Sequence, residues 1–214
     1  MTQSFDHDDD DLPVANDQTL KPQQADTSHP VWLTSVLFTL VTGVLLGLVY
    51  PLAMTAIAAV VFPHQAAGSL VERNGQVIGS SLLAQGFTTD RYFHPRPSAA
   101  GNGYDATASG GSNLAQSNLK LVQRVQGDVN KAHAENPGAA VPIDMVTTSG
   151  SGLGPDITPD NAYFQAARVA HARNLSVDTV RHLIAANTED RQFGLLGEPR
   201  VNVLQLNLAL DQLK

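Results

Sequence analysis

The stretch FTTDRYFHPRPSAAGNGYDATASGGSN, residues 87 to 113, holds the densest group of chemically versatile side chains in this sequence. A carboxylate, a histidine and two arginines lie close together and could perform acid–base chemistry or bind an anion. The neighbouring aromatics favour burial, the prolines stiffen the backbone, and the Gly-, Ser- and Asn-rich half that follows is typical of turns. Because long ordered loops bind partners more often than they catalyse unaided, we expect a docking loop here. Its candidate residues are Asp90, Arg91, Tyr92, Phe93, His94 and Arg96.

A second candidate is the glycine-rich loop TTSGSGLGPD, residues 147 to 156. It lies between a predicted strand and a predicted helix, which is the position of a phosphate-binding loop. It lacks the lysine of that motif, and the next basic residue is Arg168. Gly150, Ser151 and Gly152 could still form an anion-binding nest of backbone amides. A flexible turn is the alternative interpretation.

No set of residues indicates a catalytic or metal centre. The sequence has no cysteine, which excludes disulfides, thiolate nucleophiles and Cys-ligated metals. HExxH and GxSxG motifs are absent as well. His171 and His182 fall on separate predicted helices and have no carboxylate at metal-ligand spacing. We therefore expect no catalytic residue, no metal site and no bound cofactor in this chain.

The negative charge is concentrated at the beginning of the chain. Residues 1 to 30 hold seven aspartates and one lysine, whereas the whole protein has a net charge of −7. This segment has few apolar residues, so we expect a disordered acidic tail. No basic patch follows it, which argues against nucleic-acid binding.

Residues 31 to 62 form a long apolar segment, VWLTSVLFTLVTGVLLGLVYPLAMTAIAAVVF, without a charge. About 20 apolar residues suffice for a membrane-spanning helix, so one transmembrane helix is predicted. Trp32 and Tyr50 suit interfacial positions, and Pro51 is expected to kink the helix or to mark its exit from the lipid. A cleaved signal peptide is the alternative, but its apolar core would be shorter and would follow a basic segment.

Gly43 and Gly47 form a GxxxG pattern within the predicted span. Two glycines one turn apart let another helix approach closely, so they are candidate helix-packing residues. The charge flanks do not decide the orientation, because Lys21 and Arg73 are the nearest basic residues on either side.

Residues 64 to 214 are expected to form one mixed α+β, or irregular α/β, domain. Asn74-Gly75 predicts a β-hairpin with a type I′ turn. Apolar spacing predicts a helix from Leu114 to Asn136, and strands are predicted over 141–148 and 201–206. Further helix signals are Thr158-Pro159 as one start, Asn174 as its end, Ser176 as the next start, and Asn207 as the cap of a last helical turn.

Three long motifs in this domain resemble the C subunit of the Kdp potassium-transporting ATPase. They are GSSLLAQGFTTDRYFHPRPSAAGNGYDATASGGSNLAQSNLKL, TTSGSGLGPDITP and LLGEPRVNVLQLNLALDQL. With the apolar segment TGVLLGLVYPL before them, the resemblance covers residues 31 to 214. The family pattern near residues 152–156 is closer to GLDPH than to the GLGPD found here, so no side-chain role is carried over to that loop.

The resemblance implies a non-catalytic subunit of a bacterial inner-membrane pump that takes up potassium with high affinity. Its partners would be a channel-like potassium subunit, an ATP-hydrolysing P-type subunit and a small single-span subunit. The family is described as a catalytic chaperone that raises the ATP affinity of the hydrolysing subunit, so ATP is implied only through that partner. The N-terminus would be cytoplasmic and the domain extracytoplasmic, which means that any effect on ATP must pass through the helix or through assembly. A membrane-anchored ligand-binding module or enzyme acting alone is the alternative.

Overall fold

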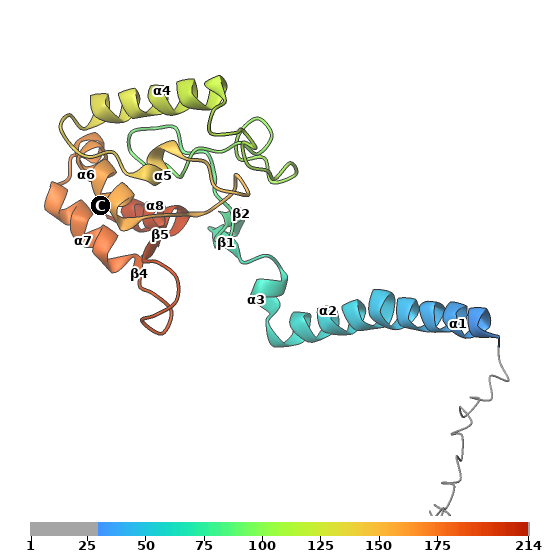
Figure 1. Ribbon diagram of the computed structural model, residues 1–214. Coiled ribbons are helices and arrows are strands. Elements are labelled where there is room, and N and C mark those ends of the chain that lie inside the picture. Colours follow the sequence, from blue (N-terminus) through green and yellow to red (C-terminus); the bar gives the residue numbers. More distant parts are fainter. Residues whose placement is uncertain (1–29, 214) are drawn as a thin grey trace, which may run out of the picture. The chain divides into compact units, whose positions relative to one another are not determined.

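The computed structural model describes residues 30–213 (Figure 1). The predicted acidic tail therefore lies outside the described residues, except for Pro30. The chain divides between Met54 and Thr55 into two units, which are described separately.

An uninterrupted apolar helix runs from Val31 to Val61. It consists of α1 (Val31–Val44), a π-helical turn η1 (Leu45–Val49) and α2 (Tyr50–Val61). Its 31 residues give a length of about 46 Å at the usual helical rise, more than the hydrocarbon core of about 30 Å. None of its side chains is buried. By length and composition the helix can cross a membrane, as the sequence predicts.

Three hydroxyl groups of α1 donate hydrogen bonds to backbone carbonyls of the same helix. Ser35 Oγ donates to Val31 O at 2.9 Å, Thr39 Oγ1 to Ser35 O at 2.9 Å, and Thr42 Oγ1 to Phe38 O at 2.7 Å. Such bonds one turn back remove the need for water, so these polar residues are compatible with a lipid environment.

The helix continues past Pro51 and changes its winding just before it. A proline cannot donate its backbone nitrogen, and its ring collides with the carbonyl four residues earlier in a regular α-helix. The π-helical turn η1 ends at Val49, two residues before Pro51, and changes the hydrogen-bond spacing there. The predicted disturbance at Pro51 is therefore a local change of helix type.

A β-hairpin follows the short helix α3 (Pro63–Ala66). Strands β1 (Leu70–Arg73) and β2 (Gln76–Ser80) pair antiparallel, with Arg73 opposite Gln76. Asn74 and Gly75 have φ of 54° and 74°. Positive φ at both central residues defines the predicted type I′ turn, which is confirmed.

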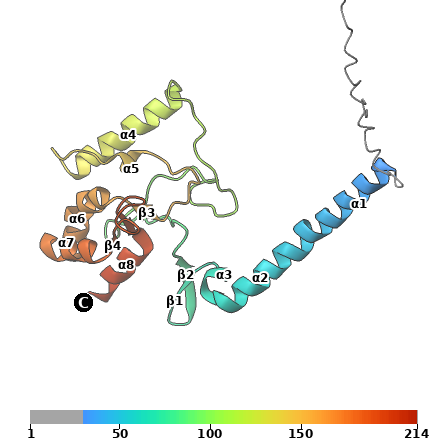
Figure 2. The same cartoon turned by 60° about the horizontal axis from the view of Figure 1, so that its bottom comes forward.

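After the hairpin, the second unit, which begins at Thr55, combines a small antiparallel sheet with several helices (Figures 1 and 2). The sheet has the order β3-β5-β4, in which the central strand β5 pairs with both neighbours. The predicted mixture of helices and strands is confirmed. The elements are α4 (Leu119–Glu135), α5 (Ile143–Val146), β3 (Asp156–Ile157), α6 (Pro159–Arg173), α7 (Val177–Ala186), β4 (Thr188–Glu189), β5 (Arg200–Asn202) and α8 (Val203–Gln212).

The predicted caps of α6 and α7 are confirmed. Thr158 accepts a hydrogen bond from Asn161 N and precedes Pro159, and Asn174 ends α6 in the left-handed region with φ of 55°. Ser176 caps α7 by accepting from Thr179 N. Side-chain oxygens at these positions satisfy amides that the helix leaves without a partner.

The predicted start of α4 is wrong by several residues. The helix begins at Leu119 rather than at Leu114, because Asn118 adopts an extended backbone and accepts a hydrogen bond from Lys120 N. Its end at Asn136 agrees with the prediction.

One predicted strand is wrong, and another is correct only for its first two residues. Within 141–148 the chain forms the helical turn α5, which directs the buried Asp144 carboxylate at Thr158 N, 2.8 Å away, and at Thr158 Oγ1. Within 201–206 the strand ends at Asn202, which caps α8, so Asn207 lies inside a helix instead of starting one. Short apolar runs fit both periodicities, and here the helical face of α8 is the one that packs in the core.

The core of the domain is built from α6, α7, α8 and the short strands, and Phe93 enters it from the loop. Phe93 is fully buried although it belongs to no helix or strand. The cluster contains Phe93, Ile157, Ala162, Ala166, Val169, Ala170, Val180, Ile184, Val201, Val203, Leu206 and Leu210.

Candidate functional site

The backbone of Phe93 and His94 is held by two side-chain amides. Asn207 accepts from Phe93 N at 2.8 Å and donates to Phe93 O at 3.0 Å. Gln165 accepts from His94 N at 2.8 Å and donates to His94 O at 3.1 Å. Asn207 and Gln165 are themselves buried, so α8 and α6 provide the partners that a neighbouring strand would otherwise give.

Two arginines of α6 hold the residues just before this pair. Arg168 Nη1 donates to Asp90 O at 2.8 Å and to Tyr92 O at 3.0 Å, while its Nε pairs with Glu135 at 2.9 Å. Arg173 Nε donates to Arg91 O at 2.7 Å. The guanidinium of Arg173 also lies 4.8 Å from the centre of the Tyr92 ring, in cation–π geometry. The backbone from residue 90 to residue 94 is thus fixed along its length.

Asp211 on α8 completes this arrangement. Its carboxylate binds Arg173 Nη2 at 2.8 Å, Arg73 Nη1 at 2.9 Å and the Tyr92 hydroxyl at 3.2 Å. Burial raises the pKa of Asp211, but the hydrogen bonds from the two arginines and the tyrosine outweigh it and hold the pKa below its ordinary value. The group therefore stays ionised at neutral pH and links α8, the loop and the β-hairpin.

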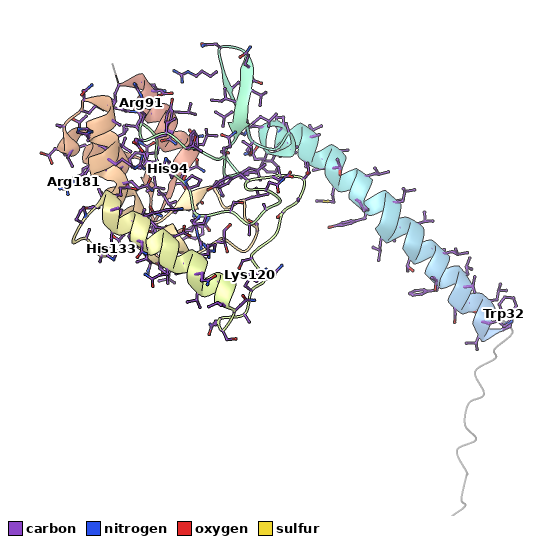
Figure 3. All side chains as sticks on the ribbon, turned by 90° about the horizontal axis from the view of Figure 1, so that it is seen from above. Trp32, Arg91, His94, Lys120, His133 and Arg181 are labelled. Atoms are coloured by element: carbon purple, nitrogen blue, oxygen red, sulfur yellow. The ribbon has the colours of Figure 1, made fainter. Side chains whose placement is uncertain are left out.

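The side chain of His94, labelled in Figure 3, faces a cavity of about 410 Å³. The cavity is lined by the loop, α4 and α6, with Lys131 and Glu135 among its charged residues. Burial, followed by the positive charge of Arg168, lowers the pKa of His94. The neutral imidazole lies 3.1 Å from Thr89 O through Nε2.

The Arg96 side chain forms hydrogen bonds within the domain. Its Nε donates to Thr147 O at 3.2 Å, and its Nη2 donates to Thr148 O at 3.1 Å. The loop around residue 147 is thereby attached to the segment that holds Phe93.

The glycine-rich loop packs against the second half of the 87–113 stretch. Ser98 Oγ donates to Gly152 O at 2.6 Å, and Gly110 N donates to Ser151 O at 2.8 Å. Gly152 has φ of 69°, and a Cβ there would lie 2.6 Å from Gly110 O. Its own amide donates to Ser149 O at 3.1 Å. The loop at 150–152 thus has a packing role, and the anion nest stays a prediction.

Asp90 and Arg91 are the exposed members of the candidate docking loop. Within residues 30–213, neither side chain takes part in a hydrogen bond or an ion pair, whereas their carbonyls are held by Arg168 and Arg173. Tyr92, Phe93, His94 and Arg96 all have internal contacts. The structure therefore divides the six candidates into two that face outward and four that build the domain.

Across residues 30–213 no group of three or more acidic, histidine or cysteine side chains could hold a metal ion. His171 and His182 lie on α6 and α7 and are both exposed. Gly43 lies in α1 and Gly47 in η1, and a Cβ at either would meet no atom within 4 Å. The glycine pair is therefore open for an approaching helix.

Residues 32–212 match the family model described as KdpC: K+-transporting ATPase, c chain. The chain belongs to the KdpC family. The match includes the apolar helix, α8 and residues 90–94, whose backbone α6 and α8 hold by hydrogen bonds. It begins after the acidic segment, as the sequence resemblance indicates.

Curated relatives in the KdpC family are similar over most of their length. A protein of Acidobacterium capsulatum named potassium-transporting ATPase KdpC subunit is 61% identical over 181 residues, which are 84% of this chain and 97% of the relative. A protein of the same name from Koribacter versatilis is 58% identical, covering 84% and 93% of the two chains. Another from Methylobacterium nodulans is 55% identical, covering 86% and 96%.

The sequence did not identify Gln165, Arg168 and Asn207 as the residues of this KdpC-family domain that hold the candidate docking loop. A signal was present in α6, where Asn161 and Gln165 are polar residues one turn apart on the face that also carries Ala162, Ala166 and Val169. A buried amide in such a face needs a partner, which indicates a bond to another segment. Which segment it binds is not readable from local spacing.

Proposed function

We propose that this chain is an accessory subunit of a bacterial ATP-driven pump for high-affinity potassium uptake. The observation that carries the proposal is the family match over residues 32–212. Relatives at 53–61% identity are named subunits of potassium-transporting ATPases. The apolar helix Val31–Val61 provides the means to join a membrane complex.

Its partners would be the channel-like potassium subunit, the ATP-hydrolysing P-type subunit and the small single-span subunit. Two surfaces support such contacts. The face of Gly43 and Gly47 allows a neighbouring helix to pack closely. Asp90 and Arg91 project from a backbone that four side chains immobilise, so little conformational freedom is lost when they bind a partner.

The chain would act as a catalytic chaperone that raises the ATP affinity of the hydrolysing subunit. In the proposed orientation the N-terminus is cytoplasmic and the domain lies outside the inner membrane. The domain then does not reach cytoplasmic ATP, and coupling runs through the membrane helix or through assembly. The π-helical turn η1 beside Pro51 supports the first route, because such turns concentrate at functional positions of helices.

The first test is a mild-detergent purification of the tagged full-length chain from potassium-starved cells, with mass spectrometry of the proteins that co-elute. Stoichiometric recovery of a P-type ATPase and a channel-like membrane subunit is expected. Recovery of the chain alone, while other membrane complexes stay intact, would contradict the proposal and favour a module acting by itself.

The second test measures the KM for ATP of the purified complex with and without this chain. The KM is expected to be lower when the chain is present. Gly47→Leu should raise the KM or reduce recovery of the complex, because added bulk separates the packed helices. Ala53→Leu adds comparable bulk elsewhere on the same helix and is the matched control. An unchanged KM after removal of the chain would overturn the chaperone role and leave the subunit role standing.

A further inference from the structure

The connection between β4 and β5 carries an exposed apolar tip. It projects from the body of the domain below β4 in Figure 1. Phe193, Leu195 and Leu196 are 96%, 81% and 57% exposed, respectively. We call these three residues the hairpin tip. Large apolar side chains gathered at such exposure on a soluble domain indicate an interaction site.

The hairpin tip has a fixed shape. Gln192 and Leu196 form an antiparallel bridge, with Gln192 N donating to Leu196 O at 2.9 Å and Leu196 N donating to Gln192 O at 2.9 Å. Phe193 has φ of 55°, in the left-handed region that bulky residues rarely adopt. Backbone strain of this kind persists where the surrounding structure enforces it, and it concentrates at functional positions.

Ion pairs brace the stem below the tip. Arg191 binds Glu198 across the stem at 2.6 Å, and Arg200 binds Glu189 at 2.7 Å. The stem continues into β5, whose Val201 is fully buried in the core. The hairpin tip is thus an exposed apolar group on a stem that is anchored in the core of the domain.

The charges around the tip argue against a lipid surface as its target. Both stem arginines are paired with glutamates, and Asp190 adds a further carboxylate. Interfacial segments combine apolar residues such as Trp, Phe and Leu with unpaired Lys and Arg, which are attracted to anionic head groups. The stem has no unpaired Lys or Arg and carries more carboxylates than arginines, so the chemistry fits an apolar pocket in a protein better than a lipid surface.

We infer that the hairpin tip inserts Phe193 and Leu195 into an apolar pocket on the extramembrane face of another subunit of the potassium-transporting ATPase. This contact is separate from the one proposed for Asp90 and Arg91, and it rests on the proposed assembly into that complex. A rigid aromatic anchor seated in a pocket is the usual centre of a protein interface.

The inference is tested in the complete complex by placing the photo-crosslinking residue p-benzoylphenylalanine at position 193 of the full-length chain and irradiating native membranes. A crosslink to another pump subunit is expected. A crosslink only to lipid, a crosslink only to a second copy of this chain, or no crosslink in a complex that still assembles would each overturn it.

Affinity provides an independent measurement. Phe193→Ser is expected to weaken binding of the detergent-solubilised chain to the remaining subunits by about 30-fold, in the range of an interface hot spot. Ile143→Ser is the matched control, because Ile143 is also an exposed aliphatic residue but lies on α5. Equal affinity for both variants and the unsubstituted chain would overturn the inference. If the unsubstituted chain itself fails to bind, the proposed function fails instead, so the two failures are distinguishable.

Discussion

At the scale of single residues, Asn207 and Gln165 use both of their amide groups on the backbone of another segment. Each donates one hydrogen bond to that backbone and accepts one from it, which satisfies the N–H and C=O of Phe93 and His94. A buried backbone group without a partner costs about 1–3 kcal/mol, so these two side chains allow an irregular segment to enter the core.

Asn207→Ala is expected to lower the free energy of unfolding by about 2–4 kcal/mol, because it leaves a buried donor and a buried acceptor of Phe93 without partners. Chemical denaturation of the full-length chain in detergent measures the change. Gln205→Ala, at an exposed position of the same helix, is the control and should change stability little. Equal effects of the two substitutions would contradict the role given to Asn207.

His94 is expected to make the domain sensitive to mild acid. Its folded-state pKa lies below the ordinary value of about 6.5, because burial and the charge of Arg168 disfavour protonation. As the pH falls below about 6.5, the unfolded chain binds a proton that the folded chain resists, and stability decreases. His94→Gln should flatten the fall of Tm between about pH 6.5 and pH 5. The exposed His182→Gln is the control, and a Tm profile that His94→Gln leaves unchanged would refute this assignment.

At the scale of elements, local signals are predictable from the sequence and distant pairings are not. Asn74-Gly75 specifies its turn, and Thr158 and Ser176 specify helix starts, because each acts on amides only a few residues away. The runs at 141–148 and 201–206 do not specify their type, since short apolar segments fit a strand or a helix.

The candidate site shows the same division. The sequence picked out the 90–96 segment by its residue types, but not Gln165 or Asn207, which hold it. These partners lie 71 and 114 residues away from the segment. Nothing in local spacing encodes a contact at that separation, so which candidates face outward and which face inward became clear only in the fold.

Gly152 joins two irregular elements, the 147–156 loop and the 98–111 loop. Gly152→Ala is expected to destabilise the domain by about 3 kcal/mol or more, because φ of 69° disfavours a side chain and the new Cβ would collide with Gly110 O. Gly138→Ala is a matched control, since Gly138 has φ of 83° but open space around it. Its cost should be about 1–2 kcal/mol from backbone strain alone. Denaturation curves measure the free energy of unfolding of both variants. Equal losses of stability would show that the close contact between residue 152 and Gly110 O does not contribute.

At the scale of the whole molecule, the chain combines an apolar helix able to lie among lipids with a domain whose outward groups include Asp90, Arg91 and the hairpin tip. In the 90–96 segment, the side chains with internal contacts are different from the exposed side chains of Asp90 and Arg91. We therefore expect substitutions to separate folding from the proposed docking.

Arg91→Glu is expected to reduce recovery of the complex at least several-fold without changing the Tm of the chain, because the Arg91 side chain is exposed and a reversed charge repels a complementary surface. Arg96→Ala, in contrast, should lower the Tm of the chain, since Arg96 donates hydrogen bonds to Thr147 and Thr148. Arg181→Glu on α7, labelled with Arg91 in Figure 3, is the charge-matched control. Affinity purification and thermal unfolding measure the two effects. Normal recovery of Arg91→Glu would rule out docking through this residue.

The hydrogen bonds from α6 and α8 to the backbone of residues 90–94 can form only late in the synthesis of the chain. A ribosome makes residue 93 long before residues 165 and 207, so the segment emerges without the amides that will hold its backbone. Until α8 has been made, Phe93 has no complete core to enter, and its apolar ring stays accessible to chaperones or to aggregation. Contacts this distant along the chain close slowly. We therefore expect the nascent domain to need protection from aggregation from the moment residue 93 leaves the ribosome until α8 follows.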